Sequence, residues 1–247
     1  MNKLRDRVLS NNFCTYNPSS RPSFRRWDEL DLVMWQVDKH LLRNKNRYID
    51  SYKDAYVKYN QQLILKYSHL EQIPPNLLAS VARIEAGGKP DMWKLNTIAM
   101  RQWNEQAFNI NKTRHKGSNE TSTGIVAMQI RHVADMMGFD SNTLTTRDQL
   151  EIATCLQLDE FNIKMVARHL KDLILYDYPN ADTSNLTKEQ YIMVGSRYNR
   201  GITRKKDDFI KAIYKSKGQR TLAEDEWVSY GEAVYNRLDH LDNLLNR

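Results

Sequence analysis

The chain contains few residues that cross-link or break the backbone: 2 cysteines, 9 glycines and 6 prolines among 247 residues. The two cysteines, Cys14 and Cys155, lack the regular spacing that marks a disulfide framework, so we expect two free thiols. Sparse glycine and proline, with long stretches rich in Leu, Lys, Glu, Gln, Ala and Arg, favour helices. We therefore expect a mainly α-helical globular protein with almost no sheet.

Sequence signatures of metal sites and membrane segments are also missing. There is no Cys-x-x-Cys and no His-Glu-x-x-His, so we expect neither a metal nor a cofactor, and we interpret His169 as a core histidine. No stretch approaches the roughly 20 apolar residues of a membrane span. The basic start, Met1 to Arg7, is not followed by the apolar core of a signal peptide. We expect synthesis in the cytoplasm without a signal peptide.

Positive charge exceeds negative charge, with a formal net charge of +7 and a pI of about 9.3. Such a chain is attracted to polyanions, which include bacterial wall polymers and nucleic acid. One interpretation is therefore a basic helical module with a phosphate-binding patch at Arg200, Arg204, Lys205 and Lys206. Because 30 acidic residues are interspersed among the 37 basic ones and no basic face stands out, we expect no nucleic-acid partner.

Composition and periodicity divide the chain into three parts. Residues 1–26 are a polar basic arm, residues 27–70 an N-terminal helical extension and residues 71–247 the main domain. The extension is predicted to contain two helices, 27–42 and 46–70. The tyrosines of the second helix recur near one face and are expected to pack in the core; they are Tyr48, Tyr52, Tyr56, Tyr59 and Tyr67. A long apolar segment, 150–175, predicts a buried central helix.

Capping-box patterns mark three helix starts, at Thr146 to Gln149, Thr187 to Gln190 and Thr221 to Glu224. A further start is set by the paired prolines Pro74 and Pro75, and that helix is ended by Gly87-Gly88.

The helix between the prolines and the glycines is apolar except near its end, where it carries Glu85 on the same side as Leu78 and Val81. Desolvation and the negative end of the helix dipole both disfavour a charged carboxylate there, which predicts a raised pKa. Glu85 would then donate a proton near neutral pH. The alternative is an ordinary helix-end glutamate whose side chain reaches solvent past the glycines.

Two later segments bear on Glu85: Ser122 to Ile130, a glycine-containing turn that runs into Met-Gln-Ile, and Gly195 to Gly201, a helix end with Tyr198-Asn199. With Glu85 they resemble the lysozyme-like superfamily, specifically soluble lytic transglycosylases and goose-type lysozymes. That family shows a helix-terminal Glu, a Ser-x-Gly-Leu-Met-Gln turn and an Ala-Tyr-Asn-x-Gly segment in this order. The resemblance spans about residues 70–240, and 227–231 look like the family's closing helix.

Two departures from the family pattern affect its loops. Ala86 stands where the family usually has Ser after the glutamate, and residues 124–129 are two longer than the family's Gly-Leu-Met-Gln. The resemblance implies a lysozyme-like helical domain around a buried central helix, in which a short hairpin within residues 93–125 is common.

The resemblance implies that Glu85 is the general acid and that Gln129, Tyr198, Asn199 and Met128 lie at the sugar site. For Gln129 the alternative is a solvated helix-start residue, and for Tyr198 and Asn199 it is a helix end with Asn199 or Gly201 in the left-handed conformation. Many glycosidases use a second carboxylate. Asp91 is the nearest candidate in sequence, with Glu105 and Glu120 as more distant options.

We therefore expect an enzyme that cuts the β-1,4 bond between N-acetylmuramic acid and N-acetylglucosamine in peptidoglycan, as a lytic transglycosylase or a muramidase. The alternative is an inactive lysozyme-like or basic helical module that binds glycan, nucleic acid or a protein partner. A wall enzyme without a signal peptide reaches the periplasm or wall as a phage endolysin or as an antibacterial effector passed through a secretion machine, and we expect the effector. A secretion-machine component or an immunity protein would then be its partner.

Overall fold

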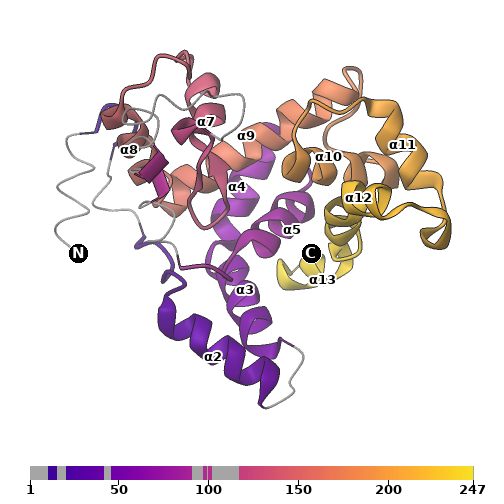
Figure 1. Ribbon diagram of the computed structural model, residues 1–247, viewed down its shortest axis with the longest axis horizontal. Coiled ribbons are helices and arrows are strands. Elements are labelled where there is room, and N and C mark those ends of the chain that lie inside the picture. Colours follow the sequence, from indigo (N-terminus) through magenta and orange to yellow (C-terminus); the bar gives the residue numbers. More distant parts are fainter. Residues whose placement is uncertain are drawn as a thin grey trace. The chain divides into compact units, whose positions relative to one another are not determined.

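The structure is a computed structural model, and it describes residues 11–15, 21–41, 46–90, 97–98, 100–101 and 117–246. The protein is mainly α-helical, as predicted, and the described residues contain one short two-stranded sheet (Figure 1). None of the described helices is long and apolar enough to cross a bilayer.

The chain forms two compact units. Unit 1 comprises Met1–Tyr56 and Glu85–Met165, and unit 2 comprises Val57–Ile84 and Val166–Arg247. The three-part division at residues 26 and 70 stays a prediction. The polypeptide passes from one unit to the other within helix α3 (Arg47–Tyr59), at the end of α5 (Pro75–Glu85) and within α9 (Asp159–Asp177).

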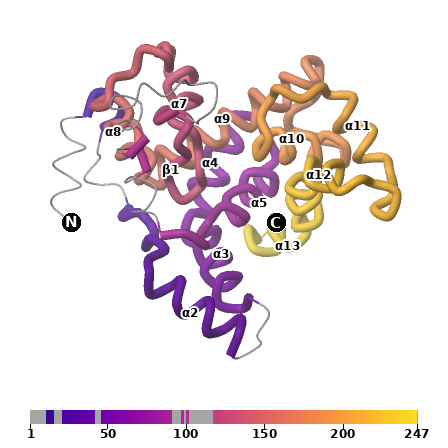
Figure 2. Tube along the Cα trace, viewed as in Figure 1, coloured from indigo at the N-terminus to yellow at the C-terminus, as the bar shows by residue number. Residues whose placement is uncertain are grey.

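Unit 1 contains the sheet and several helices, and the tube in Figure 2 traces their order. Its further elements are α2 (Glu29–His40), η1 (Ser118–Glu120), β1 (Ser122–Thr123), β2 (Met128–Gln129), α7 (Ile130–Met136) and α8 (Thr146–Cys155). The strands are antiparallel, with Ser122 opposite Gln129 and Thr123 opposite Met128. Residues 124–127 form the turn between them.

Two predicted helices are each interrupted in the structure. Residues 46–70 form α3 and α4 (Gln61–Glu71), because Asn60 leaves the helical conformation at φ −97° and ψ 13°. The predicted central helix 150–175 is α8 followed by α9, with a break at residues 156–158. The capping boxes at Thr187 and Thr221 are confirmed, whereas the first one is formed by Thr145 with Asp148, one residue earlier than predicted.

The break between α8 and α9 is bound by the extended segment before α2. The hydroxyl of Ser23 donates to the carbonyl oxygen of Gln157 at 3.3 Å and accepts from the N–H of Asp159 at 3.2 Å. The Arg26 guanidinium also donates to the Gln157 carbonyl, and the Phe24 N–H donates to the Asp159 carboxylate at 2.6 Å. Backbone groups that a continuous helix would pair internally are therefore satisfied by a distant segment.

The expectation of two free thiols is wrong, because Cys14 and Cys155 form a disulfide. The residues around Cys14 lie along α8: the Asn11 side chain donates to the Glu151 carbonyl at 2.9 Å, and Phe13 is buried. The Cα atoms of the two cysteines are 5.9 Å apart, although 141 residues separate them in sequence. Cysteine spacing reports local frameworks and cannot reveal a pairing made by tertiary packing.

We predict that Cys14→Ser lowers the free energy of unfolding by about 2–4 kcal/mol, because the cross-link restricts the unfolded chain. Denaturant unfolding with and without a reductant measures this. Reduction should destabilise the wild type by a similar amount and leave the Cys14→Ser variant unchanged. An equal unfolding midpoint for oxidised and reduced wild type would contradict the prediction.

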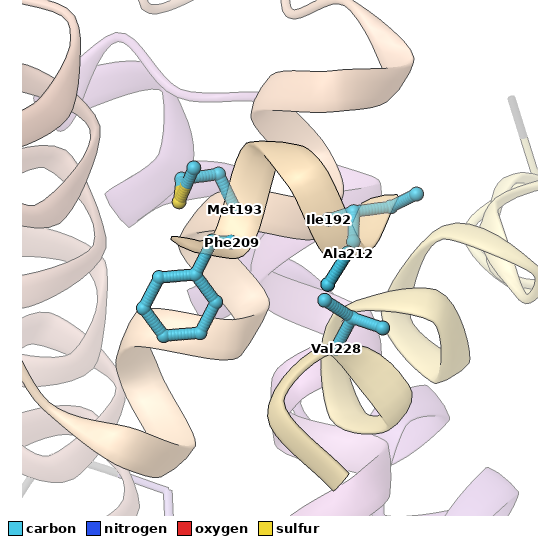
Figure 3. Close-up of a cluster of buried hydrophobic side chains, with 5 residues drawn as sticks. All are labelled: Ile192, Met193, Phe209, Ala212 and Val228. Atoms are coloured by element: carbon cyan, nitrogen blue, oxygen red, sulfur yellow. The ribbon is translucent and has the colours of Figure 1, made fainter. Parts of the chain in front are cut away.

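Unit 2 is a helical bundle. Besides α4 and parts of α5 and α9, it contains α10 (Lys188–Arg200), α11 (Lys206–Tyr214), η2 (Lys217–Gln219), α12 (Leu222–Tyr235) and α13 (Leu238–Leu244). Side chains of α10, α11 and α12 meet in an apolar cluster (Figure 3) that consists of Ile192, Met193, Phe209, Ala212 and Val228. The backbones of α10 and α12 approach closely, since a Cβ on Gly195 would lie 2.8 Å from the Cα of Gly231.

Candidate functional site

Glu85 is the last residue of α5, and the helix begins at Pro75 and ends before the two glycines as predicted. Residues 77–83 of α5 are buried, whereas the Glu85 side chain is half-buried. Gly87 and Gly88 have φ values of 78° and 97°, which only glycine adopts readily. The chain can therefore turn sharply just after the carboxylate.

The turn after Glu85 rests on aromatic rings. A Cβ on Gly87 would lie 3.0 Å from the Trp27 ring and 3.2 Å from the Tyr52 ring. These two rings meet edge to face, with centroids 4.9 Å apart, and Trp27 is 2% exposed. Ala86, at the position where the related family has Ser, is fully buried. The backbone that follows Glu85 is thus fixed by a contact that no side chain larger than hydrogen permits.

The tyrosines predicted to lie in the core include three that are buried, Tyr52, Tyr56 and Tyr67. Tyr52 and Tyr56 both make edge contacts with Phe24, at centroid distances of 5.3 and 5.7 Å. The tyrosine stripe of α3 therefore supports the segment before α2 and, through Tyr52, the glycine turn.

The hairpin is clamped by a residue that sequence reasoning missed. Asn162, on α9 and 1% exposed, accepts from the Val126 N–H at 3.0 Å and donates to the Val126 carbonyl at 2.9 Å. Gly124, at φ 88°, permits this approach, because a Cβ there would lie 2.8 Å from the Asn162 amide nitrogen. The sequence gives no local signal for Asn162, because polar residues recur throughout the 150–175 segment.

Gln129 ends β2 and precedes α7, where its side chain is held in place. Its amide oxygen accepts from Arg131 Nε at 2.7 Å, and Arg131 forms an ion pair with Glu120 at 2.9 Å. The bond occupies the amide oxygen, and the NH₂ group takes no part in it. Glu120, one of the optional second carboxylates, is engaged by this ion pair. Met128 is 3% exposed and packs beneath the hairpin.

His132 lies on α7, one turn beyond Gln129. Burial lowers the pKa of His132 below its ordinary value of 6.5, and the charge of Arg131 lowers it further. Asp135 and Glu120 act in the opposite direction but do not cancel the shift. The balance of these influences favours the neutral form of the imidazole.

We predict that protonation of His132 destabilises the fold in mild acid. Its native pKa is lowered, so the unfolded chain binds the proton more tightly, and stability is lost as the pH falls below about 6.5. His132→Gln, which cannot take up this proton, should lose less unfolding free energy than the wild type between about pH 7.5 and pH 5.5. Denaturant unfolding at both pH values measures this, and parallel losses in the two proteins would contradict it.

Tyr198 lies near the end of α10 in an aromatic group of unit 2. Its half-buried ring is 5.8 Å from His169 on α9 and 6.2 Å from Tyr230 on α12, the latter in a stacked arrangement with an interplanar angle of 25°. His169 is half-buried and lies beside this tyrosine. Asn199 is exposed and helical, whereas Gly201 has a positive φ of 77°. Of the two residues predicted to end this helix with a positive φ, Gly201 is therefore the one that does so.

A buried ion pair fixes the end of α10. Arg197, 1% exposed, donates from Nε and Nη2 to the Asp177 carboxylate, at 2.7 and 2.9 Å, and from Nη1 to the Arg204 carbonyl at 2.6 Å. Bidentate geometry of this kind holds both charges out of water at tolerable cost. The sequence gives no local signal for this pair, because its members lie on different helices.

Three of the four cations of the hypothetical phosphate patch make contacts within the protein. Arg200 contacts the carboxylate of Glu226 at 3.5 Å, and Lys206 donates to the Asp177 carbonyl at 2.5 Å. Arg204 lies 3.7 Å above the Trp227 ring. These contacts oppose a basic patch arranged for phosphates.

Within unit 1 the structure places Glu85, Met128 and Gln129, and within unit 2 it places Tyr198 and Asn199. Asp91 and Glu105 lie outside the described residues. Among the residues that the structure describes, no group of His, Cys, Asp and Glu side chains could hold a metal ion. A cavity of about 740 Å³ in unit 2, lined by residues such as His69, Asn76 and Asp242, contains none of the predicted site residues.

Comparisons with protein-family models, with curated proteins and with solved structures find no match to this chain. The lysozyme-like family therefore stays a prediction that rests on the ordered motifs.

We predict that Asn162→Ala destabilises the protein by about 1–3 kcal/mol for each of the two Val126 backbone groups that it leaves unpaired. Thermal or denaturant unfolding measures the change. Asn243→Ala, at an exposed position of α13, is the control and should stay within about 0.5 kcal/mol of the wild type. Equal effects of the two substitutions would mean that the clamp does not support the hairpin.

Proposed function

We propose that this protein is a peptidoglycan-cleaving glycosidase of lysozyme-like type, with Glu85 as its general acid. The observation that carries the proposal is the setting of Glu85: a half-buried carboxylate at the end of a buried helix. Its position is fixed by Gly87 against Trp27 and Tyr52. Glycosidic cleavage requires a carboxylic acid that protonates the leaving oxygen, and the family that this chain resembles uses the glutamate at this position for that step.

In the family that this chain resembles, a lytic transglycosylase uses a single glutamate, and that is the mechanism proposed here. Among the described candidates, Glu120 is paired with Arg131. With one carboxyl group, Glu85 first gives its proton to the glycosidic oxygen as the bond to the sugar carbon breaks. Its carboxylate then takes the proton from the sugar's own hydroxyl as that oxygen bonds to the same carbon. The product is an anhydro sugar, whereas attack by water would give the reducing end made by a muramidase.

Sugar recognition is assigned to Gln129, Tyr198 and Asn199 in this proposal. The Gln129 side chain is oriented by Arg131, and an amide suits hydroxyl and N-acetyl groups because it both donates and accepts. The Tyr198 ring, next to Tyr230, offers an aromatic face to a pyranose.

The disulfide supports action outside the cytoplasm. Disulfides persist in the periplasm and in extracellular space and are rare in the reducing cytoplasm. The Cys14–Cys155 bond therefore agrees with delivery to the periplasm or cell wall, as proposed for an antibacterial effector. A secretion-machine component or an immunity protein would be the protein partner in that case.

The test is mass spectrometry of the soluble products released from peptidoglycan sacculi by the wild type and by Glu85→Gln. We expect anhydro-muropeptides from the wild type and a rate at least ~100-fold lower for the variant, the usual contribution of a general acid. Glu71→Gln is the matched control, since Glu71 is also a half-buried last residue of a helix, α4, and lies outside the three motifs. It should retain wild-type activity.

Each other result has a distinct meaning. Reducing-end muropeptides would make the protein a muramidase. Release that survives Glu85→Gln would remove Glu85 from the role of acid. If the wild type releases no products, the proposed glycosidase activity is refuted. Co-sedimentation of the protein with sacculi in that case would favour a module that binds glycan without cutting it.

A further inference from the structure

Helix α2 buries two carboxylates and exposes several large apolar side chains, whereas a surface helix usually turns its apolar side to the core. Its two buried residues are Asp31 and Asp38, which are 3% and 7% exposed. Large apolar side chains point to solvent on the helix and its cap, with exposed fractions of 69% for Leu30, 56% for Val33, 43% for Met34 and 75% for Leu41. A contiguous apolar surface of this kind marks an interaction site.

The orientation of α2 is fixed by the partners of its buried acids. The Asp31 carboxylate accepts two bonds from the Arg25 guanidinium, at 2.9 and 2.7 Å, and one from the Tyr48 hydroxyl at 2.8 Å. Asp38 accepts from the Tyr48 N–H at 2.9 Å, in the first turn of α3. Rotating α2 to bury its apolar side would break these hydrogen bonds with Arg25 and Tyr48.

The apolar residues of α2 follow the spacing of a helix-pairing seam. Leu30, Met34, Val37 and Leu41 are separated by four, three and four residues, which is the alternation of positions a and d in a heptad. The stripe runs along the whole helix, which appears beside α3 in Figure 1.

We infer that α2 is the dimerisation helix of this protein and pairs antiparallel with α2 of a second copy. The ends of α2 are complementary: its first turn is acidic, with Glu29 after the exposed cap Asp28, and its last turn is basic, with Lys39 and His40. Antiparallel pairing about a two-fold axis places each acidic end beside the partner's basic end.

A membrane surface fits this helix less well than a second copy. Helices that bind anionic bilayers carry Lys and Arg on their polar side. The exposed charges of α2 are mixed, with Glu29 in its first turn and Lys39, its one lysine, in its last turn.

The pairing should be weak. Stable interfaces bury about 1,200 Å² or more, and two helices of this length provide an area at the low end of that range. We expect a dissociation constant on the order of 10 µM.

Sedimentation velocity of the full chain, from about 1 to 300 µM, measures the equilibrium directly. Leu30→Lys should raise the dissociation constant at least ~10-fold, because it places a charge in the seam. Leu222→Lys is the matched control: Leu222 is also an exposed leucine in the first turn of a helix, with 88% of its surface exposed, and this change should have no effect. Circular dichroism melting confirms that both variants remain folded, as expected for exposed positions.

Cross-linking tests the antiparallel register. Since both native cysteines are in the disulfide, an introduced cysteine is the only thiol. Antiparallel pairing brings Met34 next to Val37 of the partner, so an oxidised mixture of Met34→Cys and Val37→Cys chains should give more mixed dimer than either chain alone gives self-dimer. Preferential self-dimers would indicate a parallel pair instead.

A wild type that remains monomeric to about 300 µM would overturn the inference, as would a Leu30→Lys variant that dimerises like the wild type. Binding of α2 to lipid vesicles in place of self-association would assign the stripe to a membrane. None of these results depends on glycosidase activity, so the inference and the proposed function fail separately.

Discussion

The break between α8 and α9 leaves backbone N–H and C=O groups that cannot pair within either helix. The local structure of unit 1 depends on the hydrogen bonds that satisfy these groups. Ser23, Phe24 and Arg26 satisfy the groups at Gln157 and Asp159. This holds the segment before α2 against the start of α9. The first turn of α9 then presents Asn162 to the hairpin. The position of Gln129 is therefore linked by a chain of hydrogen bonds to residues more than a hundred positions earlier.

The disulfide reinforces the same arrangement from the α8 side of the break. Cys14 is bound to Cys155, the last residue of α8 and the one just before the break. The N-terminal part of the chain is thus attached on both sides of the interruption, covalently before it and by hydrogen bonds after it. The segment predicted as a polar arm contains the residues that fix the local geometry of unit 1.

Sequence patterns predicted what depends on neighbouring residues. The limits of α5, the caps at Thr187 and Thr221 and the core tyrosines Tyr52 and Tyr56 all follow from spacing over a few turns. The break in the 150–175 helix was missed because an uninterrupted apolar pattern conceals it and its partners lie near residue 24. The Arg197–Asp177 pair and the disulfide were missed for the same reason, since each joins residues whose proximity only the folded chain creates.

At the candidate site, the sequence motifs identified Glu85, Gln129 and Tyr198. They did not identify the residues that support these three side chains. Trp27 beneath Gly87, Arg131 on Gln129 and His169 beside Tyr198 come from elsewhere in the chain or carry no motif. Supporting residues of this kind are recognised by their position in the folded structure. A single sequence therefore does not distinguish them from ordinary core or surface positions.

The close crossing of α10 and α12 has a consequence for the aromatic face of unit 2. Gly195 lies one turn before Tyr198, and Gly231 directly follows Tyr230, so the two stacked tyrosines are mounted on helices whose main chains touch. Where backbone meets backbone there is no intervening side chain to change rotamer and alter the separation. The main chain therefore fixes the separation of the two positions that carry these rings. A flat ligand that binds there would not have to order this part of the backbone, because folding has already done so.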